Sequence, residues 1–219
     1  MSDFFPKWTN RLPRQIAVGL ALVGTGVSAG LWYYFTPKYV RVGYQPVQPV
    51  SFSHAVHANQ LGLDCRYCHN TVDKSWYGNI PAASTCMNCH RQVLPTDARL
   101  ALVRESDQSG RPIPWVQIHK LPEYVYFNHA VHVQRGVSCV VCHDRVDLMD
   151  EVRQAKPLSM DFCLSCHRHP APNLRPLDQV YNLAWTNAPF DPLYPEGIGA
   201  KLAADWDAKP SQNCSACHR

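Results

Sequence analysis

All ten cysteines of the 219-residue chain fall within one short pattern, Cys-x-x-Cys-His, which occurs five times. The cysteine pairs are Cys65 and Cys68, Cys86 and Cys89, Cys139 and Cys142, Cys163 and Cys166, and Cys214 and Cys217, and the histidines that follow them are His69, His90, His143, His167 and His218. Two thiols three residues apart on a short helix can reach both vinyl groups of one porphyrin, and the next histidine can offer a ring nitrogen to the iron. This is the attachment pattern of c-type haem. The sequence therefore predicts five covalently bound haem c groups, each with a proximal histidine.

Other uses of paired cysteines agree less well with the pattern. Zinc sites need paired cysteines but no histidine directly after each pair, and a disulfide framework has no use for that histidine either. Since the five motifs use every cysteine, we expect no disulfide bond.

Two further histidine pairs precede haem motifs. The pattern Phe-x-His-x-x-His at residues 52–57 recurs 75 residues later at residues 127–132. Histidines three residues apart lie on one face of a helix, but their rings can turn toward two neighbouring haems. We expect the first histidine of each pair to bind the haem of its own unit, and the second to bind another haem. The predicted distal ligands are His54, His57, His129 and His132.

The sequence leaves the distal ligand of the fifth haem open. The candidates are the methionines Met149 and Met160, which lie between the third and fourth motifs, and the remaining histidines His119 and His169. A methionine thioether raises haem potential relative to a second imidazole. We favour a methionine, which would give mostly bis-histidine haems and one His–Met haem.

The spacing of the motifs indicates an internal repeat. The first and third motifs are 74 residues apart, and the second and fourth are 77 apart. The predicted organisation is a cytoplasmic N-terminus (1–15), a transmembrane helix (16–35), a linker (36–50), a first dihaem unit (51–126), a second dihaem unit (127–170) and a Pro-rich extended segment ending in the fifth motif (171–219).

The predicted membrane helix, residues 16–35, contains no charged side chain. Twenty helical residues span about 30 Å, the thickness of the hydrocarbon core of a bilayer. A cleaved signal peptide, with Val27-Ser28-Ala29 as a cleavage site, is the alternative. Because c-type haem is attached on the periplasmic or outer side, we expect a single-pass protein of the inner membrane with its haem domain on that side.

Composition narrows the fold and the class of partner. Charged residues make up 17% of the chain and the formal net charge is only +4, without a run of Lys or Arg, so the sequence predicts no nucleic-acid binding. Hydrophobic residues at 46% argue against disorder. One haem for every ~36 soluble residues leaves too little chain for a large apolar core. We therefore expect a mainly α protein with much irregular loop, whose haems form the core.

The histidine pairs and closely spaced motifs resemble the cytochrome c3 and c7 family. Over nearly its full length, the chain looks similar to the pentahaem, membrane-anchored ActA subunits of alternative complex III, most clearly in residues 115–132 and 157–168. The resemblance implies an electron-transfer subunit of a quinol-oxidising membrane complex, with no catalytic residues of its own. It implies an iron–sulfur subunit, polytopic membrane subunits and a monohaem cytochrome c or other carrier as partners, besides membrane lipid.

Two other functions compete with this hypothesis. A self-contained quinol dehydrogenase of the NapC/NrfH type also has one membrane anchor and several haems. A multihaem enzyme would need a haem with an open coordination position, but six spare histidines and two suitable methionines can fill all five.

Overall fold

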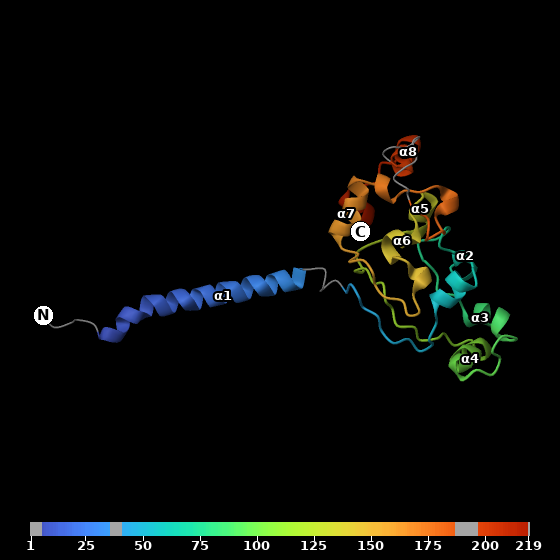
Figure 1. Cartoon of the computed structure of the whole chain (residues 1–219), viewed down its shortest axis with the longest axis horizontal. Coiled ribbons are helices and arrows are strands. Elements are labelled where there is room, and N and C mark those ends of the chain that lie inside the picture. Colours follow the sequence, from blue (N-terminus) through green and yellow to red (C-terminus); the bar gives the residue numbers. More distant parts are fainter. Residues whose placement is uncertain (1–5, 36–40, 187–196, 219) are drawn as a thin grey trace. The chain divides into compact units, whose positions relative to one another are not determined.

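The computed structural model of the protein describes residues 6–35, 41–186 and 197–218 (Figure 1). The chain divides into two compact units, with the boundary after Val42. In the described ranges there are helices, turns and two isolated β-bridges but no named strand. The fold is thus mainly α with long irregular connections, as predicted.

The N-terminal unit consists of the 3-10 turn η1 (Lys7–Arg11) and helix α1 (Leu12–Phe35). The predicted span, residues 16–35, lies within α1. The stretch Lys7–Phe35 is long and apolar enough to cross a membrane, and none of its most apolar window is buried. A signal sequence would have the same length and composition. The start of the predicted linker, residues 36–40, lies outside the described residues.

The compact unit that follows Val42 begins with the elements of the first two motifs. They are the π-helical turn η2 (Ala55–Gln60), helices α2 (Cys65–Cys68) and α3 (Ala83–His90), the turn η3 (Ala98–Leu100) and helix α4 (Ala101–Ser109). The following elements are α5 (His129–Gln134), α6 (Cys139–His143), η4 (Val146–Leu148), α7 (Met160–Arg168), η5 (Ala171–Asn173), η6 (Leu177–Gln179), α8 (Ile198–Asp205) and α9 (Cys214–Cys217). Every cysteine pair therefore lies on a short helix.

Local sequence explains where three of the motif helices begin. The side chain of Asp64 accepts a hydrogen bond from the backbone of Arg66, that of Ser159 from Phe162, and that of Asn213 from Ser215. Asp, Ser and Asn are the residues that best satisfy the free N–H groups of a first helical turn. These caps stabilise α2, α7 and α9, which are too short to be stable alone.

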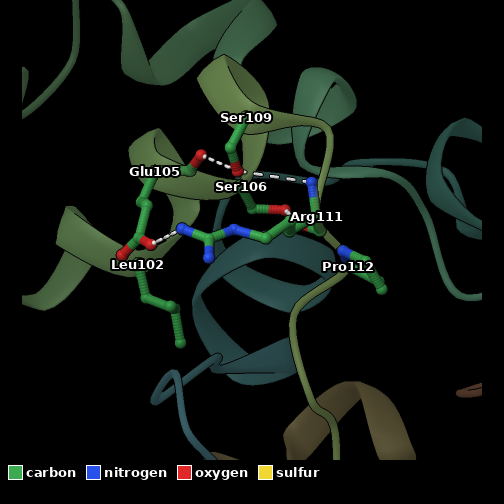
Figure 2. Close-up of a pocket in the computed structure, with 6 residues that line it drawn as sticks. All are labelled: Leu102, Glu105, Ser106, Ser109, Arg111 and Pro112. Carbon is green, nitrogen blue, oxygen red and sulfur yellow. Dashed lines mark hydrogen bonds and ion pairs between the residues drawn. The ribbon is translucent and has the colours of Figure 1, made fainter.

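Buried apolar side chains are few among the described residues. One cluster of them, Val50, Ala83, Met87 and Val103, packs where α3 meets α4. At the C-terminal end of α4, Gly110 takes the left-handed conformation (φ 70°), which glycine adopts without strain. The chain then turns back, so that Arg111 pairs with Glu105 at 2.6 Å beside a small hollow (Figure 2).

The Pro-rich segment is less extended than predicted. It contains η5, η6 and helix α8, which packs on η5. Gly199 is buried, and a Cβ at this position would collide with the carbonyl oxygen of Ala171, so the contact requires glycine. The prediction of an extended segment is wrong for α8, since its apolar face lies against an element 27 residues earlier. Residues 187–196 lie outside the described residues.

Candidate functional site

The predicted first dihaem unit contains two pairs of neighbouring histidine rings. The ring centres of His54 and His69 are 6.4 Å apart with parallel planes, and those of His57 and His90 are 6.2 Å apart at 62°. In each pair, one ring comes from the Phe-x-His-x-x-His segment and the other directly follows a cysteine pair. The predicted distal and proximal ligands of two haems therefore face each other.

The predicted second dihaem unit repeats one of these pairs. His132 and His167 lie with ring centres 6.2 Å apart at 45°. This pair corresponds to His57 and His90 in the repeat. In both pairs, the second histidine of a Phe-x-His-x-x-His segment faces a motif histidine: His132 faces the fourth motif, and His57 faces the second.

The spacing of these three pairs is that of an iron with two axial imidazoles. Metal–nitrogen bonds of about 2 Å, with each nitrogen about 1 Å from its ring centre, place two ring centres about 6 Å apart. Direct ring contacts are closer, as in the 4.5 Å stacking of Phe52 on His57. The three pairs thus have the right composition and separation to hold haem iron.

The phenylalanine of each segment orders both histidines. Phe52 meets His54 edge-on at 4.9 Å and stacks on His57 at 4.5 Å and 25°. Phe127 repeats these contacts with His129 at 4.8 Å and with His132 at 4.5 Å and 28°. Sequence reasoning gave the phenylalanine no role, although its recurrence at the same position was the available signal.

The third motif breaks the pattern. By the repeat, His143 should face His129, but its nearest ring is that of His119, with centres 4.4 Å apart at 81°. His129 instead lies against Gly78 and its Nδ1 donates to the carbonyl of Trp76 at 2.9 Å. Among the described residues, no motif histidine faces His129 at the spacing of the other pairs.

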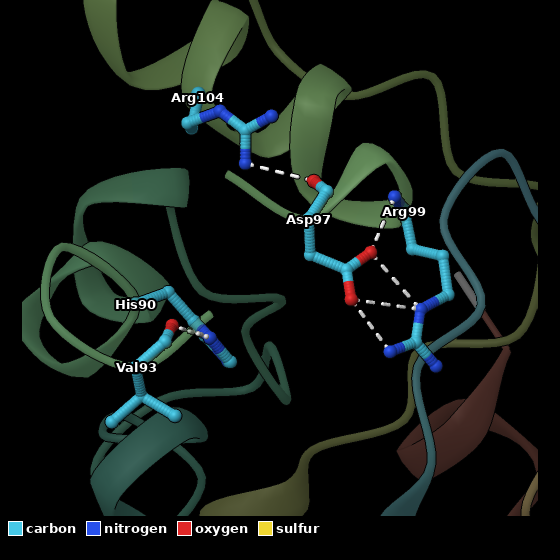
Figure 3. Close-up of polar contacts among 5 residues, drawn as sticks. All are labelled: His90, Val93, Asp97, Arg99 and Arg104. Carbon is cyan, nitrogen blue, oxygen red and sulfur yellow. Dashed lines mark hydrogen bonds and ion pairs between the residues drawn. The ribbon is translucent and has the colours of Figure 1, made fainter. Parts of the chain in front are cut away.

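Backbone carbonyls hold the Nδ1 atoms of most candidate ligands. Among the proximal histidines, His69 reaches Asn79 at 2.6 Å, His90 reaches Val93 at 3.0 Å (Figure 3) and His167 reaches Ser211 at 2.6 Å. Among the distal ones, His57 reaches Ser53 and His132 reaches Asn128, both at 2.8 Å. A carbonyl acceptor fixes the proton on Nδ1 and leaves Nε2 as the metal-binding atom.

The loop that supplies the Val93 carbonyl is held by charge. Arg99 forms a 2.6 Å ion pair with Asp97 and holds the pKa of that carboxyl at about 2. Arg104, from α4, donates to the backbone carbonyl of Asp97 at 2.9 Å (Figure 3). These contacts link α4 to the segment that orients His90.

The surroundings of the histidines favour neutral rings. Burial lowers the pKa of His54 to about 4, with a further contribution from His69, and lowers the pKa of His143 to about 3, with a further contribution from His119. Burial also lowers the pKa of His132. A neutral imidazole has the free electron pair that a metal ligand requires.

The cysteine side chains are unevenly buried. Burial raises the pKa of Cys139 to about 12, and the nearby Cys65 adds to the rise. Burial likewise raises the pKa of Cys142 to about 11, with Cys163 close enough to contribute. The third motif is therefore close to both the first and the fourth.

The same proximity links the remaining motifs. Burial raises the pKa of Cys68 with a contribution from Cys86, and that of Cys163 with a contribution from Cys217. These contributions bring together the second motif with the first, the first with the third, the third with the fourth and the fourth with the fifth. This order differs from the order of the motifs in the chain.

Hydrogen bonds between motifs support this order. The side chain of Asn88, inside the second motif, donates to the hydroxyl of Tyr67, inside the first, at 3.1 Å. The N–H of Ala130, in α5, donates a hydrogen bond to the carbonyl of Ser75, in the loop after the first motif, at 3.1 Å. His167 of the fourth motif reaches Ser211, three residues before the fifth.

The fifth motif pairs with the segment that precedes the second histidine pair. Val125 and His218 form an antiparallel bridge, and the N–H of Tyr126 donates to the carbonyl of Cys217 at 2.8 Å. The ring of His218 lies beside that of Tyr124, with centres 5.7 Å apart. Among the described residues, no second histidine ring pairs with that of His218.

The four candidates for the fifth distal ligand lie in different surroundings. Met149 is buried, and its carbonyl accepts from Ala55 in the first unit. Met160 is 67% exposed at the start of α7. His119 contacts His143, and His169 ends α7. Among the described residues, no three His, Cys, Asp or Glu side chains gather as in a zinc site.

Comparison with known proteins points to the same class of protein as the motifs do. Residues 125–219 match the family of cytochrome c7 and related cytochrome c. This cytochrome c7-like part contains the second histidine pair and the last three motifs, and the family implies covalently bound c-type haem.

One curated relative extends the comparison. The chain is 36% identical over 100 residues to the menaquinone reductase, multihaem cytochrome c subunit, of Nitratidesulfovibrio vulgaris (strain Hildenborough). The match covers 45% of this chain and 47% of the relative, so the chain spans about half the length of that protein. The similarity is to a cytochrome subunit of a reductase complex.

Proposed function

We propose that the chain is an electron-transfer subunit that carries five covalently bound c-type haems and has no catalytic residues of its own. The observation that carries the proposal is the set of three histidine pairs with ring centres 6.2–6.4 Å apart, each joining a distal candidate to a motif histidine. When bound, haem iron takes up and releases one electron.

In this proposal, each cysteine pair forms the two thioether links and each motif histidine is the proximal ligand. His54, His57 and His132 are the distal ligands for the first, second and fourth motifs. For the third motif we retain His129, because the repeat places it there and because its ring and that of His143 are near enough to interact electrostatically.

Two imidazoles occupy both axial positions of an iron and leave none for a substrate. The three pairs therefore favour electron transfer over chemistry at an open iron. A high-spin ferric signal in the resting protein, as an open coordination position gives, would contradict this part of the proposal.

For the fifth motif, we propose Met160 as the distal ligand. Met160 and Cys163 lie three residues apart on α7 and hence share a helix face, and Cys163 is close to Cys217 of the fifth motif. Met149 is less suitable because it is buried beside Ala55, in the first unit. Near-infrared spectroscopy of the ferric protein tests this: Met160→His should remove a His–Met charge-transfer band that Met149→Leu leaves in place.

The spatial order of the motifs indicates where partners bind. The second and fifth motifs end the order. Each has an exposed cysteine, Cys89 and Cys214, as does the fourth motif with Cys163. We propose that the protein exchanges electrons with its partners at these two ends.

We further propose that α1 is a single-pass anchor in the inner membrane, with the haem-binding unit on the periplasmic side. There, the subunit would receive electrons from a quinol-oxidising complex of the alternative complex III type, through an iron–sulfur subunit. Polytopic membrane subunits would hold it in place, and a monohaem cytochrome c or another carrier would accept its electrons.

A second candidate function reverses the direction of electron flow. The curated relative is named as a subunit of a menaquinone reductase. A subunit of that kind would deliver electrons from a periplasmic donor to a complex that reduces menaquinone. The same ligand set would serve both directions.

The test is extraction of the membrane-bound protein in mild detergent. Intact-mass spectrometry should show five covalent haems, and copurification of an iron–sulfur subunit and polytopic subunits would support the proposed complex. Reduction of that complex by a quinol favours the first direction, whereas quinone-dependent oxidation of the prereduced haems by the complex favours the second. Rapid reduction of the isolated chain by quinol would instead indicate a self-contained quinol dehydrogenase.

A further inference from the structure

His119 lies in the connection between the two dihaem units, before the second histidine pair. Its Nε2 is 3.3 Å from Nδ1 of His143, the histidine of the third motif. The two rings meet edge to face, with centres 4.4 Å apart at 81°. Sequence reasoning had considered His119 only as a ligand for the fifth haem.

This geometry does not suit an axial ligand opposite His143. Iron between two imidazoles requires ring centres about 6 Å apart, and the three ligand pairs in the structure have that separation. The 4.4 Å between His119 and His143 is too short. The contact also involves Nδ1 of His143, the nitrogen that does not bind metal in the other motif histidines.

The position of the proton on His143 decides the direction of this hydrogen bond. The Nδ1 atoms of His69, His90 and His167 face carbonyl oxygens, so in those rings Nδ1 carries the proton and Nε2 is left for the iron. If His143 binds iron through Nε2 in the same way, its Nδ1–H donates and Nε2 of His119 accepts.

The other motif histidines have a different partner at this place. The Nδ1 atoms of His69, His90 and His167 donate to backbone carbonyls. Only the third motif, among these four, uses a side chain. The orientation of the His143 ring therefore depends on a side chain, which a substitution can remove. The orientations of the other three rings depend on backbone carbonyls, which a substitution leaves in place.

We infer that His119 is a positioning residue for the third haem: it accepts the hydrogen bond of His143 Nδ1–H, fixes the tautomer of that ring and makes its Nε2 a stronger ligand. The inference rests on the haem-binding function proposed above. A hydrogen bond to the remote nitrogen of a ligating histidine raises the basicity of the ligand. A more basic ligand favours ferric iron, so His119 lowers the potential of one haem.

The experiment is a redox titration of the full-length, haem-loaded protein in detergent, with the low-spin EPR signals recorded on the same samples. His119→Phe keeps an aromatic ring but offers no acceptor. We expect one of the five midpoint potentials to rise by about 59 mV, a tenfold change in the equilibrium constant of a one-electron couple. His119→Gln, whose amide oxygen restores an acceptor, should return most of that shift. His169→Phe, a change at the other spare histidine, should shift none.

Three outcomes would overturn the inference. They are unchanged potentials in His119→Phe, equal shifts in His119→Phe and His119→Gln, and the appearance of high-spin iron in His119→Phe, which would make His119 an axial ligand. If five haems are attached in every variant, the proposed function stands whichever of these results is found. Loss of covalent haem from the unaltered protein would instead disprove the function itself.

A measurement on the unaltered protein covers the case in which His119→Phe does not fold. In the fully reduced, diamagnetic protein with 15N-labelled histidine, Nε2 of His119 should show the chemical shift of an unprotonated nitrogen and a coupling across the hydrogen bond to Nδ1 of His143. A protonated Nε2, or no coupling in a resolved spectrum, would contradict the inference.

Discussion

The two dihaem units have the same sequence pattern but differ in how completely they form ligand pairs. In the first unit, both His54 and His57 face a motif histidine at 6.2–6.4 Å. In the second, His132 does so, whereas His129 lies against Gly78 of the first unit. The contacts of Phe52 and Phe127 are nearly the same in both. The difference therefore begins beyond the histidine segment itself.

What distinguishes the second unit is its position between other segments. Its histidine helix α5 packs on the loop after the first motif, and His119 from the connection between the units reaches His143. A duplicated segment thus keeps its internal contacts, while its neighbours change the use of individual residues.

Removal of a distal ligand should have the largest effect and tests the comparison directly. His57→Leu and His132→Leu should each convert one low-spin haem to a high-spin one, because each leaves an iron without its second imidazole. If His129 also binds iron, as we propose for the third motif, His129→Leu should do the same. EPR of the ferric protein counts the high-spin haems, with His169→Leu as the control. A low-spin spectrum for His129→Leu alone would show that the two units use different ligand sets.

Truncation of the phenylalanines should have the next largest effect. Phe→Ala in a full core costs about 3–5 kcal/mol. Phe52 and Phe127 are only half-buried, so we expect a loss of about 2 kcal/mol for each. The losses should be similar because the ring contacts are similar. Denaturant unfolding of the haem-loaded variants measures them, with Phe→Leu as the conservative control, and a difference above about 1 kcal/mol between the units would contradict their equivalence.

A smaller effect is expected at the contact of Gly78 with His129, which joins the two predicted dihaem units. A Cβ on Gly78 would lie 3.3 Å from Cε1 of His129, which is tighter than ordinary van der Waals contact. Gly78→Ala should displace that ring and cost about 1 kcal/mol. The expected signature is a change in one low-spin EPR signal with the others intact. Gly30→Ala in α1 is the control, because a Cβ at Gly30 would meet no neighbour. Gly62→Ala would not serve, because Gly62 has a positive φ.

The smallest effect concerns the hydrogen bond between the first two motifs. Tyr67→Phe removes the hydroxyl that accepts from Asn88. Because both side chains are solvent-accessible, we expect a loss of about 0.5 kcal/mol, with all haem potentials close to those of the unaltered protein. Asn88→Ala should give the same loss, and the double variant no further loss. Additive losses in this cycle would show that the bond contributes nothing.

The parts of the structure that could be predicted from the sequence are those fixed by short-range spacing. Cys-x-x-Cys-His gives the short motif helices, and Phe-x-His-x-x-His gives paired histidines whose rings lie opposite different motif histidines, as those of His54 and His57 do. The residues are few and close in sequence, so tertiary packing has little freedom to change their geometry.

The roles of His119 and α8 could not be predicted in the same way. His119 acts on a ring 24 residues away, and α8 packs on η5 across the segment 187–196. Neither contact has a periodic or spaced motif as its signal. Both contacts depend on the paths of the irregular connections. With so small an apolar core, no pattern of apolar residues in the sequence indicates those paths.

The bridge between Val125 and His218 bears on how the protein folds. The segment that enters the second histidine pair acquires its backbone partner from the end of helix α9. These partners are about 90 positions apart in the chain, and closing so long a loop costs entropy that only later contacts offset. We therefore expect the backbone around Tyr126 to become ordered late in folding, after the short-range contacts within each histidine segment have formed.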